Sequence, residues 1–366
     1  MATPRLASKH GEGRATAGDI VVSASAQGAS DISAIIPVYN GEVTLRRSLE
    51  PLLAMRGRGE IAEIIVVDDG STDTTAAIAG ALGVRVVDSG GRVGPGGARN
   101  VAASMAVGDV LWFVDADVVV HADAARVLAE ALRRTGAAAV FGTYDDDPPA
   151  TGFLSLYKNL VHAYYHRREQ GAAHTFWAGC GAVRKQAFLD AGGFDGMRYP
   201  QPSIEDIELG WRLRQRGLAI QIVPALQAKH LKVWRLKNLL RTEILQRAVP
   251  WSRLIQEQGA VTDTLNISRA ERLRALLVVC CLGTIILAAA GSTPGWVPAA
   301  MLGGVAIANG RLFDFFRRRR GVMFALGAVA FHQAYYLYST ATFAWCWFEH
   351  RWSVARLALR RGASAR

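Results

Sequence analysis

Val110-Leu111-Trp112-Phe113-Val114-Asp115-Ala116-Asp117 joins an uninterrupted apolar run to a pair of acids. Such a run is typical of a strand that is buried on both faces of a parallel sheet. Open α/β sheets bind ligands at the carboxyl ends of their strands, where Asp115 and Asp117 fall. If the strand stays regular, the i, i+2 spacing turns both carboxylates to one face. Paired carboxylates suit Mg²⁺ or Mn²⁺, and a plain surface turn is the alternative interpretation of this motif alone.

Strand and helix patterns alternate on both sides of this run. Apolar runs predict strands at 32–38, 63–67, 84–88, 109–114 and 138–142, and helical periodicity appears between them at 43–54, 74–81, 98–106 and 122–135. Such alternation predicts a parallel sheet that is covered by helices, with right-handed crossovers. Further along we expect helices at 153–168 and 205–216 and a short strand at 220–223. An amphipathic basic helix at 231–247 either lies on a membrane surface or packs on the core.

Polar residues follow the other predicted strand ends. Asp68 and Asp69 end the second strand, where Asp69 is placed to accept hydrogen bonds from a nucleobase or ribose, while Asp68 is expected to shape the turn. The stretch Gly94-Pro95-Gly96-Gly97 opens a helix, so its backbone and the nearby Arg99 can serve an anion. A plain glycine-rich turn is the alternative there.

Three acids lie within four residues at the start of the predicted helix 205–216, namely Glu205, Asp206 and Glu208. Negative charge at a helix N-terminus is favourable by itself, so a solvated helix end is one interpretation. The other is catalytic, because a carboxylate that faces the metal site across a cleft can take a proton from an attacking hydroxyl.

The chain has 366 residues, is 51% hydrophobic and carries a formal net charge of +11. Residues 1–30 are small and polar, so we expect a disordered tail without a signal peptide and a following domain that stays in the cytoplasm. Apolar segments at 273–291, 296–308 and 322–348 predict two to three transmembrane segments, before a basic tail at 349–366. Because basic clusters flank these segments, anionic membrane lipid is favoured over nucleic acid as a partner.

Basic loops prefer the cytoplasm, so residues 268–274 and Arg317–Arg320 are expected beside the catalytic domain. Segments 273–291 and 296–316 then form a hairpin. A third segment at 322–348 either places the tail outside or dips into the membrane and returns. A buried helical subdomain is the alternative for this whole region.

Together these motifs resemble family 2 glycosyltransferases, the inverting nucleotide-sugar enzymes with the GT-A fold. The resemblance covers about residues 31–230, with interfacial helices expected at 231–272. It rests on Pro37-Val38-Tyr39-Asn40, Val67-Asp68-Asp69-Gly70-Ser71, Gly97-Ala98-Arg99-Asn100, Asp115-Ala116-Asp117, Gly192-Gly193-Phe194-Asp195 and Glu205-Asp206 followed by Arg212. It implies an α/β GT-A domain, a divalent metal cofactor (Mg or Mn) and a nucleotide-sugar donor.

The resemblance also implies a role for each matching residue. Asp206 is the catalytic base, Asp117 ligates the metal, and His230 lies near the diphosphate as a second candidate ligand. Asp115 binds the donor sugar or ribose, and the other donor-binding residues are Pro37, Tyr39, Asn40, Asp69 and Arg99. The loop under the sugar and the acceptor contains Trp177, Gly179, Cys180 and Gly181, with Glu205 beside it.

The membrane segments fit family members that glycosylate lipid-linked acceptors, so the expected function is transfer at the cell membrane to a lipid-linked or glycan acceptor. The stretch from Gln246 through Arg247 to Trp251 has the residues of the Gln-x-x-Arg-Trp motif of processive synthases at a different spacing, which argues against polymerisation. One alternative is a nucleotidyltransferase, which would need a basic glycine-rich loop in place of Asn40-Gly41-Glu42. Another is a non-catalytic nucleotide-sugar-binding membrane scaffold, which has no need of both Asp117 and Asp206.

Overall fold

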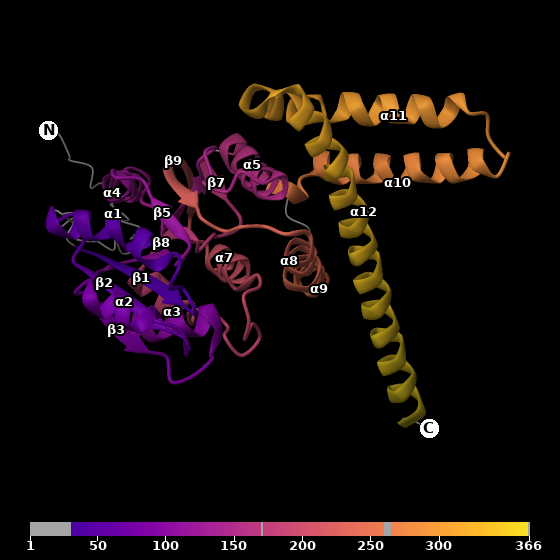
Figure 1. Ribbon diagram of the computed structural model, residues 1–366. Coiled ribbons are helices and arrows are strands. Elements are labelled where there is room, and N and C mark those ends of the chain that lie inside the picture. The colour runs from indigo at the N-terminus through magenta and orange to yellow at the C-terminus, as the bar shows by residue number, and fades with distance from the viewer. Residues whose placement is uncertain (1–30, 170, 260–264, 365–366) are drawn as a thin grey trace, which may run out of the picture.

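The computed structural model describes residues 31–169, 171–259 and 265–364, and the predicted tail at 1–30 lies outside them. An α/β domain is followed by a helical region (Figure 1). The strands are β1 (Ile32–Val38), β2 (Glu63–Asp68), β3 (Arg85–Asp88), β4 (Val110–Val114), β5 (Val118–Val120), β6 (Ala139–Tyr144), β7 (Gly171–Ala173), β8 (Cys180–Arg184) and β9 (Ile220–His230). The helices of the domain are α1 (Leu45–Gly57), α2 (Thr75–Ala81), α3 (Gly94–Met105), α4 (Ala124–Thr135), α5 (Phe153–Arg168), α6 (Lys185–Asp190) and α7 (Glu205–Gln215).

One mixed sheet forms the centre of the domain, in the order β3-β2-β1-β4-β8-β6-β9-β5, with β7 paired to β9. Strands β1 to β4 are parallel, as are β6 and β9, whereas β8 runs antiparallel between β4 and β6. The prediction of a mostly parallel sheet is therefore confirmed. The antiparallel strands β5, β7 and β8 and the short helix α6 were not predicted, because each is only three to six residues long and short elements carry little periodicity.

Alternate residues of the strands feed two separate cores. Trp112 of β4 lies in the core under α1 and α4, while its neighbours Leu111 and Phe113 lie in the core under α3, α6 and α7. Period-two alternation with both faces apolar is what a sheet covered on both sides requires. The sheet is thus held rigidly between two helical layers, and the residues that follow its strands are held in fixed positions (Figure 1).

The helical region contains α8 (Leu236–Arg241), the π-helical turn η2 (Thr242–Ala248), α9 (Val249–Gln258), the 3₁₀ turn η3 (Leu265–Ile267), α10 (Arg269–Ala289), α11 (Trp296–Ala308) and α12 (Gly310–Ser364). The helix predicted at 231–247 was placed too early. Strand β9 ends at His230 and helix begins only at Leu236. The helix continues beyond Pro250 because proline is tolerated near the start of α9.

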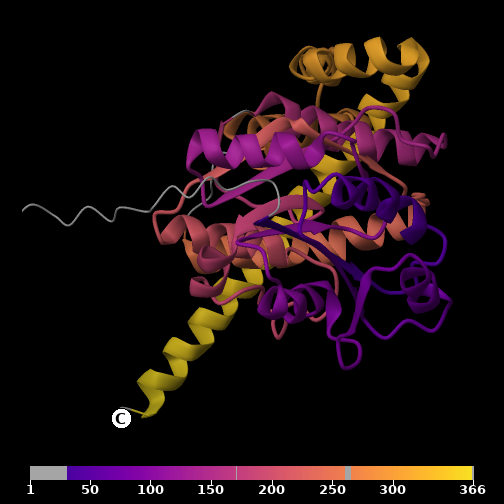
Figure 2. The ribbon, with the colours of Figure 1, turned by 90° about the vertical axis from the view of Figure 1, so that its left-hand side faces the viewer.

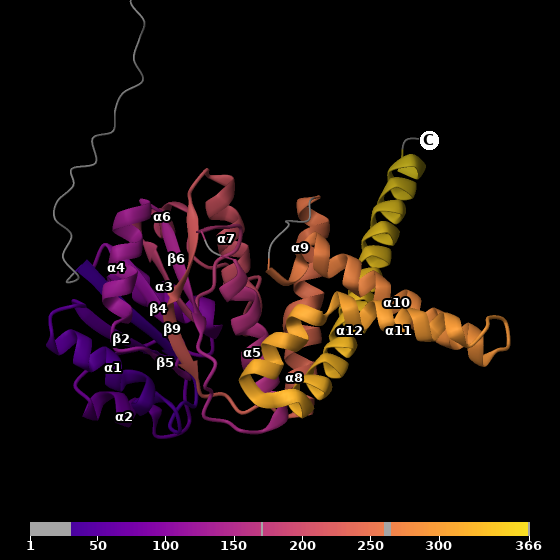
Figure 3. The same cartoon turned by 90° about the horizontal axis from the view of Figure 1, so that it is seen from above.

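Helices α10 and α11 form an antiparallel hairpin that projects away from the α/β domain (Figures 1 and 3). Helix α12 runs past α8 and α9 (Figure 1), and its C-terminal end extends beyond the rest of the molecule (Figure 2). It has a non-helical Gly321 at its kink. Within the described residues, α10 is the one helix long and apolar enough to cross a membrane, and only 11% of its apolar window is buried. Helix α11 is shorter, at 13 residues.

The third membrane segment predicted at 322–348 is not supported, because it lies inside α12, which is not among the described helices apolar enough to cross a membrane, and because part of it packs against protein. Ala325 and Ala328 pack on α5, and the buried His332 shares hydrogen bonds with the hydroxyls of Tyr157 and Tyr165, at 2.8 and 3.2 Å. An apolar helix that carries a few polar residues with hydrogen-bond partners is suited to packing against another helix, here α5. Multi-pass topology and an external tail stay predictions.

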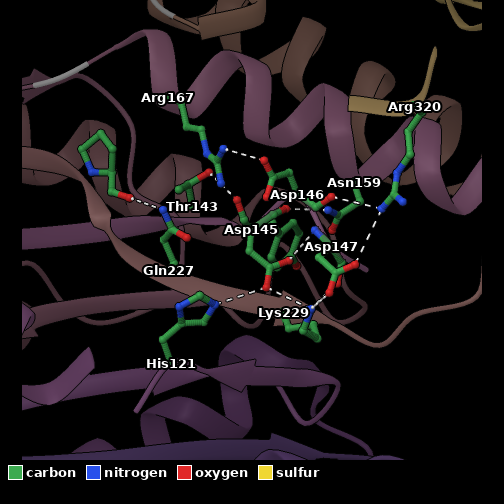
Figure 4. Close-up of polar contacts among 12 residues, drawn as sticks. His121, Thr143, Asp145, Asp146, Asp147, Asn159, Arg167, Gln227, Lys229 and Arg320 are labelled. Atoms are coloured by element: carbon green, nitrogen blue, oxygen red, sulfur yellow. Dashed lines mark hydrogen bonds and ion pairs between the residues drawn. The ribbon is translucent and has the colours of Figure 1, made fainter. Parts of the chain in front are cut away.

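An ion-pair cluster ties α12 to the domain near its kink. The loop Asp145–Asp147 follows β6, and Arg319 contacts the carboxylate of Asp146 while Arg320 approaches that of Asp147 at 3.8 Å. Figure 4 shows Arg320 reaching this loop together with Arg167 of α5 and Lys229 of β9. The positive charge of Arg317–Arg320 is thus partly neutralised by carboxylates of the α/β domain, and the cluster lies beside that domain.

Candidate active site

The Asp115-Ala116-Asp117 motif lies on a tight turn between β4 and β5. The amide of Val118 donates to the carbonyl of Asp115 at 2.9 Å, so the strand does not stay regular as predicted. The turn still presents both carboxylates to one cavity, with side chains 35% and 31% exposed. The expectation of two clustered acids at this sheet edge is met by a turn and not by strand alternation.

His230 reaches Asp117 because β9 is much longer than predicted. Strand β9 pairs with β5 so that His230 lies opposite Val118, and the Nε2 of His230 is 3.5 Å from Oδ2 of Asp117. Burial opposes ionisation of Asp117, but the neighbouring His230 and Lys232 outweigh it and lower the pKa of this carboxyl. Carboxylate and imidazole together could hold a divalent ion whose remaining positions are taken by water or phosphate.

Arg99 connects two of the predicted site acids. Its guanidinium donates to Oδ1 of Asp115 at 2.6 Å and to Oε1 of Glu205 at 3.2 Å, and the side chain is buried. Both carboxylates fix the guanidinium, and Arg99 also lines the cavity, so its predicted role toward an anion stays a prediction. Its placement orients Asp115 toward the cavity and joins α3 to the start of α7.

Asp69 organises the glycine-rich loop. Its carboxylate accepts hydrogen bonds from the hydroxyl of Ser89 at 3.0 Å and from the amides of Val93 and Gly94 at 2.8 and 3.1 Å. Gly94 has a φ of 77°, a conformation that favours glycine. The buried Asp69 still lines the cavity. Asp68 accepts from the amide of Ser71 at 3.0 Å, which confirms its predicted role in the turn.

The turn after β1 lies beside this loop. Asn40 has a φ of 50°, and its side-chain oxygen accepts from the amide of Thr72 at 2.8 Å, which joins the turns that follow β1 and β2. The guanidinium of Arg92 stacks on the ring of Tyr39 at 3.3 Å from its centroid. Pro37, Tyr39 and Asn40 all line the cavity, and the ring of Tyr39 gives its wall an aromatic part at the sheet edge.

Asp206 enters the cavity from the first turn of α7. Its oxygens accept from the amides of Ala178 and Ile207 at 3.0 and 2.8 Å. Burial and the neighbouring carboxylate of Glu205 raise the pKa of Asp206 to about 7, despite these hydrogen bonds and the charge of Arg99. A carboxyl with such a pKa can bind and release a proton near neutral pH.

The loop that the sequence placed at 177–181 divides into two parts. Trp177 and Gly179 line the cavity, and a Cβ at Gly179 would lie 2.6 Å from the Trp177 ring, so the close contact needs glycine. Cys180 and Gly181 differ from the expectation, because they begin the central strand β8. Burial raises the pKa of the Cys180 thiol to about 12, as expected for a core residue.

The remaining motif residues hold these parts together. Asn100 makes two hydrogen bonds to the backbone of Phe194, at 2.7 and 2.9 Å. Arg212 donates to the carbonyls of Ala191 and Gly193 and pairs with Glu208. These contacts fix α3 and α7 relative to each other, which sets the distance between the glycine-rich loop and Asp206.

Residues 33–192 match the family model of Glycosyl transferase family 2. These residues therefore form a glycosyl transferase family 2 domain. The chain is 34% identical over 110 residues to the succinoglycan biosynthesis protein ExoO of Rhizobium meliloti, which covers 29% of this chain and 31% of that protein. It is 24% identical over 209 residues to the pre-mycofactocin glycosyltransferase of Mycobacterium tuberculosis, covering 55% and 42% of the two chains. The chain thus spans less than half the length of these curated relatives.

Among solved structures, the chain is similar to a mannosyltransferase of Pyrobaculum calidifontis in complex with GDP-Man and Mn²⁺. The TM-score is 0.57 at 18% identity, and the match covers 86% of this chain and 87% of that one. At this identity the likeness shows the fold, an α/β fold of the GT-A type with a C-terminal helical region. The fold expected from the sequence is therefore confirmed for the family 2 domain.

The family 2 domain shares its cavity with the helical region. A single cavity of about 1120 Å³ is lined at one end by Asp69, Asp115, Asp117 and Asp206, and it continues between α5, η2, α10 and α12. Sequence reasoning did not assign Lys158, Glu243 or Tyr144 to it. Tyr144 stacks flat on His230, with ring centroids 4.4 Å apart. Of the residues compared with the Gln-x-x-Arg-Trp motif, Gln246 and Arg247 reach the cavity wall from the π-helical turn η2, and Trp251 reaches it from α9.

Proposed function

We propose that the protein is a metal-dependent, inverting glycosyltransferase that moves a sugar from a nucleotide-diphosphate donor to a lipid-linked or glycan acceptor at a membrane. The observation that carries the proposal is one cavity in which the Asp117–His230 pair and Asp206 both lie, within a family 2 domain. The solved relative with GDP-Man and Mn²⁺ supports a nucleotide-sugar donor and a divalent ion.

The donor lies along the edge of the sheet. Tyr39 and Asn40 contact the nucleoside, and the glycine-rich loop held by Asp69 shapes the floor beneath it. Asp115, oriented by Arg99, binds the ribose or the sugar. Asp117 and His230 would hold the divalent ion, which would supply positive charge to offset the negative charge that develops on the leaving diphosphate.

Asp206 acts as the general base. It removes the proton from the acceptor hydroxyl, the hydroxyl oxygen bonds to the anomeric carbon, and the bond from that carbon to the diphosphate breaks. One displacement inverts the anomeric centre. A pKa of about 7 keeps Asp206 basic enough to accept a proton and still ionised above neutral pH. Hydrogen bonds from Ala178 and Ile207 keep its oxygens in place during the reaction.

The helical region associates the enzyme with a membrane. Helix α10 has the length and composition of a spanning helix, and large apolar side chains such as Leu276, Leu282 and Ile286 are exposed on it. Exposed surface of this kind on a helical hairpin is stable in lipid and costly in water. The preference of basic residues for the cytoplasm, together with the contact of Arg319 with the α/β domain, supports a cytoplasmic position of this domain.

The test is a donor screen with the purified full-length protein in a neutral detergent. UDP-, GDP- and dTDP-sugars are supplied with Mn²⁺ and a membrane lipid extract, and release of nucleoside diphosphate is measured. We expect release with one donor class that stops when the metal is chelated. No release with any donor, although nucleotide binds, would identify a non-catalytic scaffold and refute the proposal.

A further inference from the structure

Helix α12 carries an apolar stripe along its exposed side, here called the outer stripe. Its members recur at intervals of three, four and four residues, an eleven-residue repeat that rotates by only about 20° per repeat on an α-helix. They are Met323, Leu326, Ala330, Ala334, Leu337, Ala341, Trp345, Phe348 and Trp352, all exposed except the half-buried Leu337. No Asp, Glu, Lys or Arg occurs between Gly321 and Phe348. The stripe therefore follows the helix as a nearly straight apolar band.

The opposite side of α12 is covered by protein. Ala325 and Ala328 pack on α5, and the thiol of Cys346 lies 3.9 Å from the carbonyl of Val249 in α9. In the middle of the outer stripe, Leu337 packs on the cluster that joins α10, α11 and α12. The other members of the stripe have no such cover among the described residues. A contiguous apolar surface of this length is costly in water and marks an interaction surface.

The hairpin of α10 and α11 indicates what covers the stripe. It extends crosswise to α12, on the side of the molecule that faces away from the α/β domain (Figures 1 and 3). Helix α10 has the length and composition to enter a membrane, and Leu282 and Ile286 are exposed on it. Two crosswise elements cannot both stand along the membrane normal. A bilayer that receives the hairpin therefore extends along α12.

The C-terminal end of the outer stripe has the composition of a membrane interface. The guanidinium groups of Arg351 and Arg356 stack on the rings of Trp347 and Trp352, at 5.2 and 5.1 Å from the ring centroids. The sequence after Glu349 contains five arginines and no acid, and Glu349 itself pairs with an arginine of α9. Tryptophan rings settle at the boundary between acyl chains and headgroups, and arginines are attracted to anionic headgroups. This end of α12 is thus complementary to anionic lipid.

We propose that the outer stripe of α12 is a docking surface for an anionic bilayer. The helix lies in the plane of the interface while the hairpin of α10 and α11 enters the lipid. Because an antiparallel hairpin returns the chain to the side that it left, the C-terminal end of α12 lies on the same side of the membrane as the α/β domain. Residues 322–348 then neither cross the membrane nor dip into it. This inference rests on the membrane association in the proposed function and is independent of the transfer chemistry.

Depth-dependent quenching tests this orientation. Full-length protein with Cys280→Ser, whose remaining cysteines are buried, carries a fluorescent probe on Ala330→Cys or Ala341→Cys. It is reconstituted into vesicles of equal parts of phosphatidylcholine and phosphatidylglycerol, with a nitroxide at a shallow or a deep acyl position. Both alanines are exposed, and they lie about 16 Å apart along the helix axis. We expect the shallow nitroxide to quench both probes equally, and a probe on the exposed Ser104→Cys of α3 to stay unquenched.

Three other outcomes would overturn the proposal. A spanning α12 would place Ala330 and Ala341 at depths about 16 Å apart, so that the two nitroxides would quench them in opposite order. A second copy of the chain on the outer stripe would shield both probes from either nitroxide and make the protein associate as its concentration rises in detergent. Probes that stay in water without such association would show that nothing covers the stripe.

The native Cys280 separates this inference from the proposed function. It is exposed on α10, so a probe attached to it in the unaltered protein should be quenched by lipid nitroxides. If this probe also escapes quenching, the membrane association in the proposed function fails. If only the probes on the outer stripe escape, the docking surface alone is refuted.

A probe on Ser353→Cys, next to Trp352, tests the charge and the side of the membrane. Its quenching should rise with phosphatidylglycerol content, and joint replacement by Arg351→Gln and Arg356→Gln should weaken this contact about tenfold or more, since each arginine near an anionic surface contributes roughly fivefold. The matched control is the exposed Arg134→Gln on α4. In intact cells an impermeant thiol reagent should label Ser353→Cys only after lysis. Quenching that ignores lipid charge, or labelling before lysis, would overturn the proposal.

Discussion

Replacing Asp206 with asparagine should abolish the pH dependence of sugar transfer as well as most of its rate. With a pKa of about 7, a general base is about 10% ionised at pH 6 and about 90% ionised at pH 8. The unaltered enzyme should therefore accelerate roughly tenfold over this range, if the base limits the rate. Asp206→Asn should lower the rate by roughly 10²- to 10⁴-fold, the usual contribution of a positioned base, and leave a flat profile.

The same substitution should alter stability with a defined sign. The pKa of Asp206 is raised in the folded protein, to about 7 from 3.8, so the folded state binds more protons than the unfolded chain between these values. Ionising the carboxyl therefore costs stability as pH rises through this window, by about 4 kcal/mol in full. Relative to the unaltered protein, the asparagine variant should gain stability by up to about this amount from pH 4 to pH 8.

The assay is initial rate against pH for the unaltered protein, Asp206→Asn and the exposed control Asp190→Asn, with chemical denaturation of each at both pH extremes. The control should follow the unaltered protein in rate and stability. A profile that is flat between pH 6 and 8 in the unaltered enzyme, or the same rise in Asp206→Asn, would refute the assignment of the base. A parallel collapse of donor binding in Asp206→Asn would make it a donor-site residue.

Three further results are expected. Asp117→Asn should remove most transfer and weaken Mn²⁺ binding while the fold persists, because an amide cannot replace the lost charge; full activity in excess chelator would contradict the metal role. The protein should stay in the membrane fraction after a high-salt wash, since apolar burial by α10 is insensitive to salt; quantitative release would mean that only charge holds it there. The contact between Arg319 and Asp146 should contribute no more than about 1 kcal/mol in a double-mutant cycle, because both side chains are partly exposed; a much larger coupling would show that the loop Asp145–Asp147 orders α12.

The sequence predicted the sheet because its central strands are long and apolar. It could not show that β9 continues to His230, since the polar residues Gln227 and Lys229 interrupt the apolar pattern. They are accommodated because β9 pairs with β5 and β6 near the edge of the sheet, beyond an irregularity at Thr143. The contact of His230 with Asp117 follows from that pairing, which no local pattern encodes.

The sequence identified the acidic residues of the site, but it did not identify the residues with which each of them makes hydrogen bonds. A strand-end motif does not tell whether a carboxylate faces a ligand or the protein, and Asp69 accepts its hydrogen bonds from its own loop. Arg99 is likewise fixed by Asp115 and Glu205, and its contact with Glu205 joins residues that are 106 positions apart in the sequence. Long-range pairs of this kind become visible only once the fold sets them side by side.

Residues 322–348 present two kinds of apolar surface that hydropathy does not distinguish. A run of Phe, Ala and Tyr looks the same whether lipid or another helix covers it, and here α5 covers Ala325 and Ala328. In the same helix Met323, Leu326 and Trp345 are exposed, as several leucines of α10 are. The sequence alone could not show which of these apolar residues another helix covers, because only the fold sets the two helices side by side.

Transfer of labelled sugar into lipid is the most direct test of the central claim. The purified protein is incubated with Mn²⁺, a membrane lipid extract and each radiolabelled nucleotide sugar, and label in the organic phase is counted beside Asp117→Asn and Asp206→Asn. We expect label to enter the organic phase from one donor class, and both variants to prevent most of it. Label that stays in the aqueous phase with every donor, or transfer that both variants retain, would contradict the account.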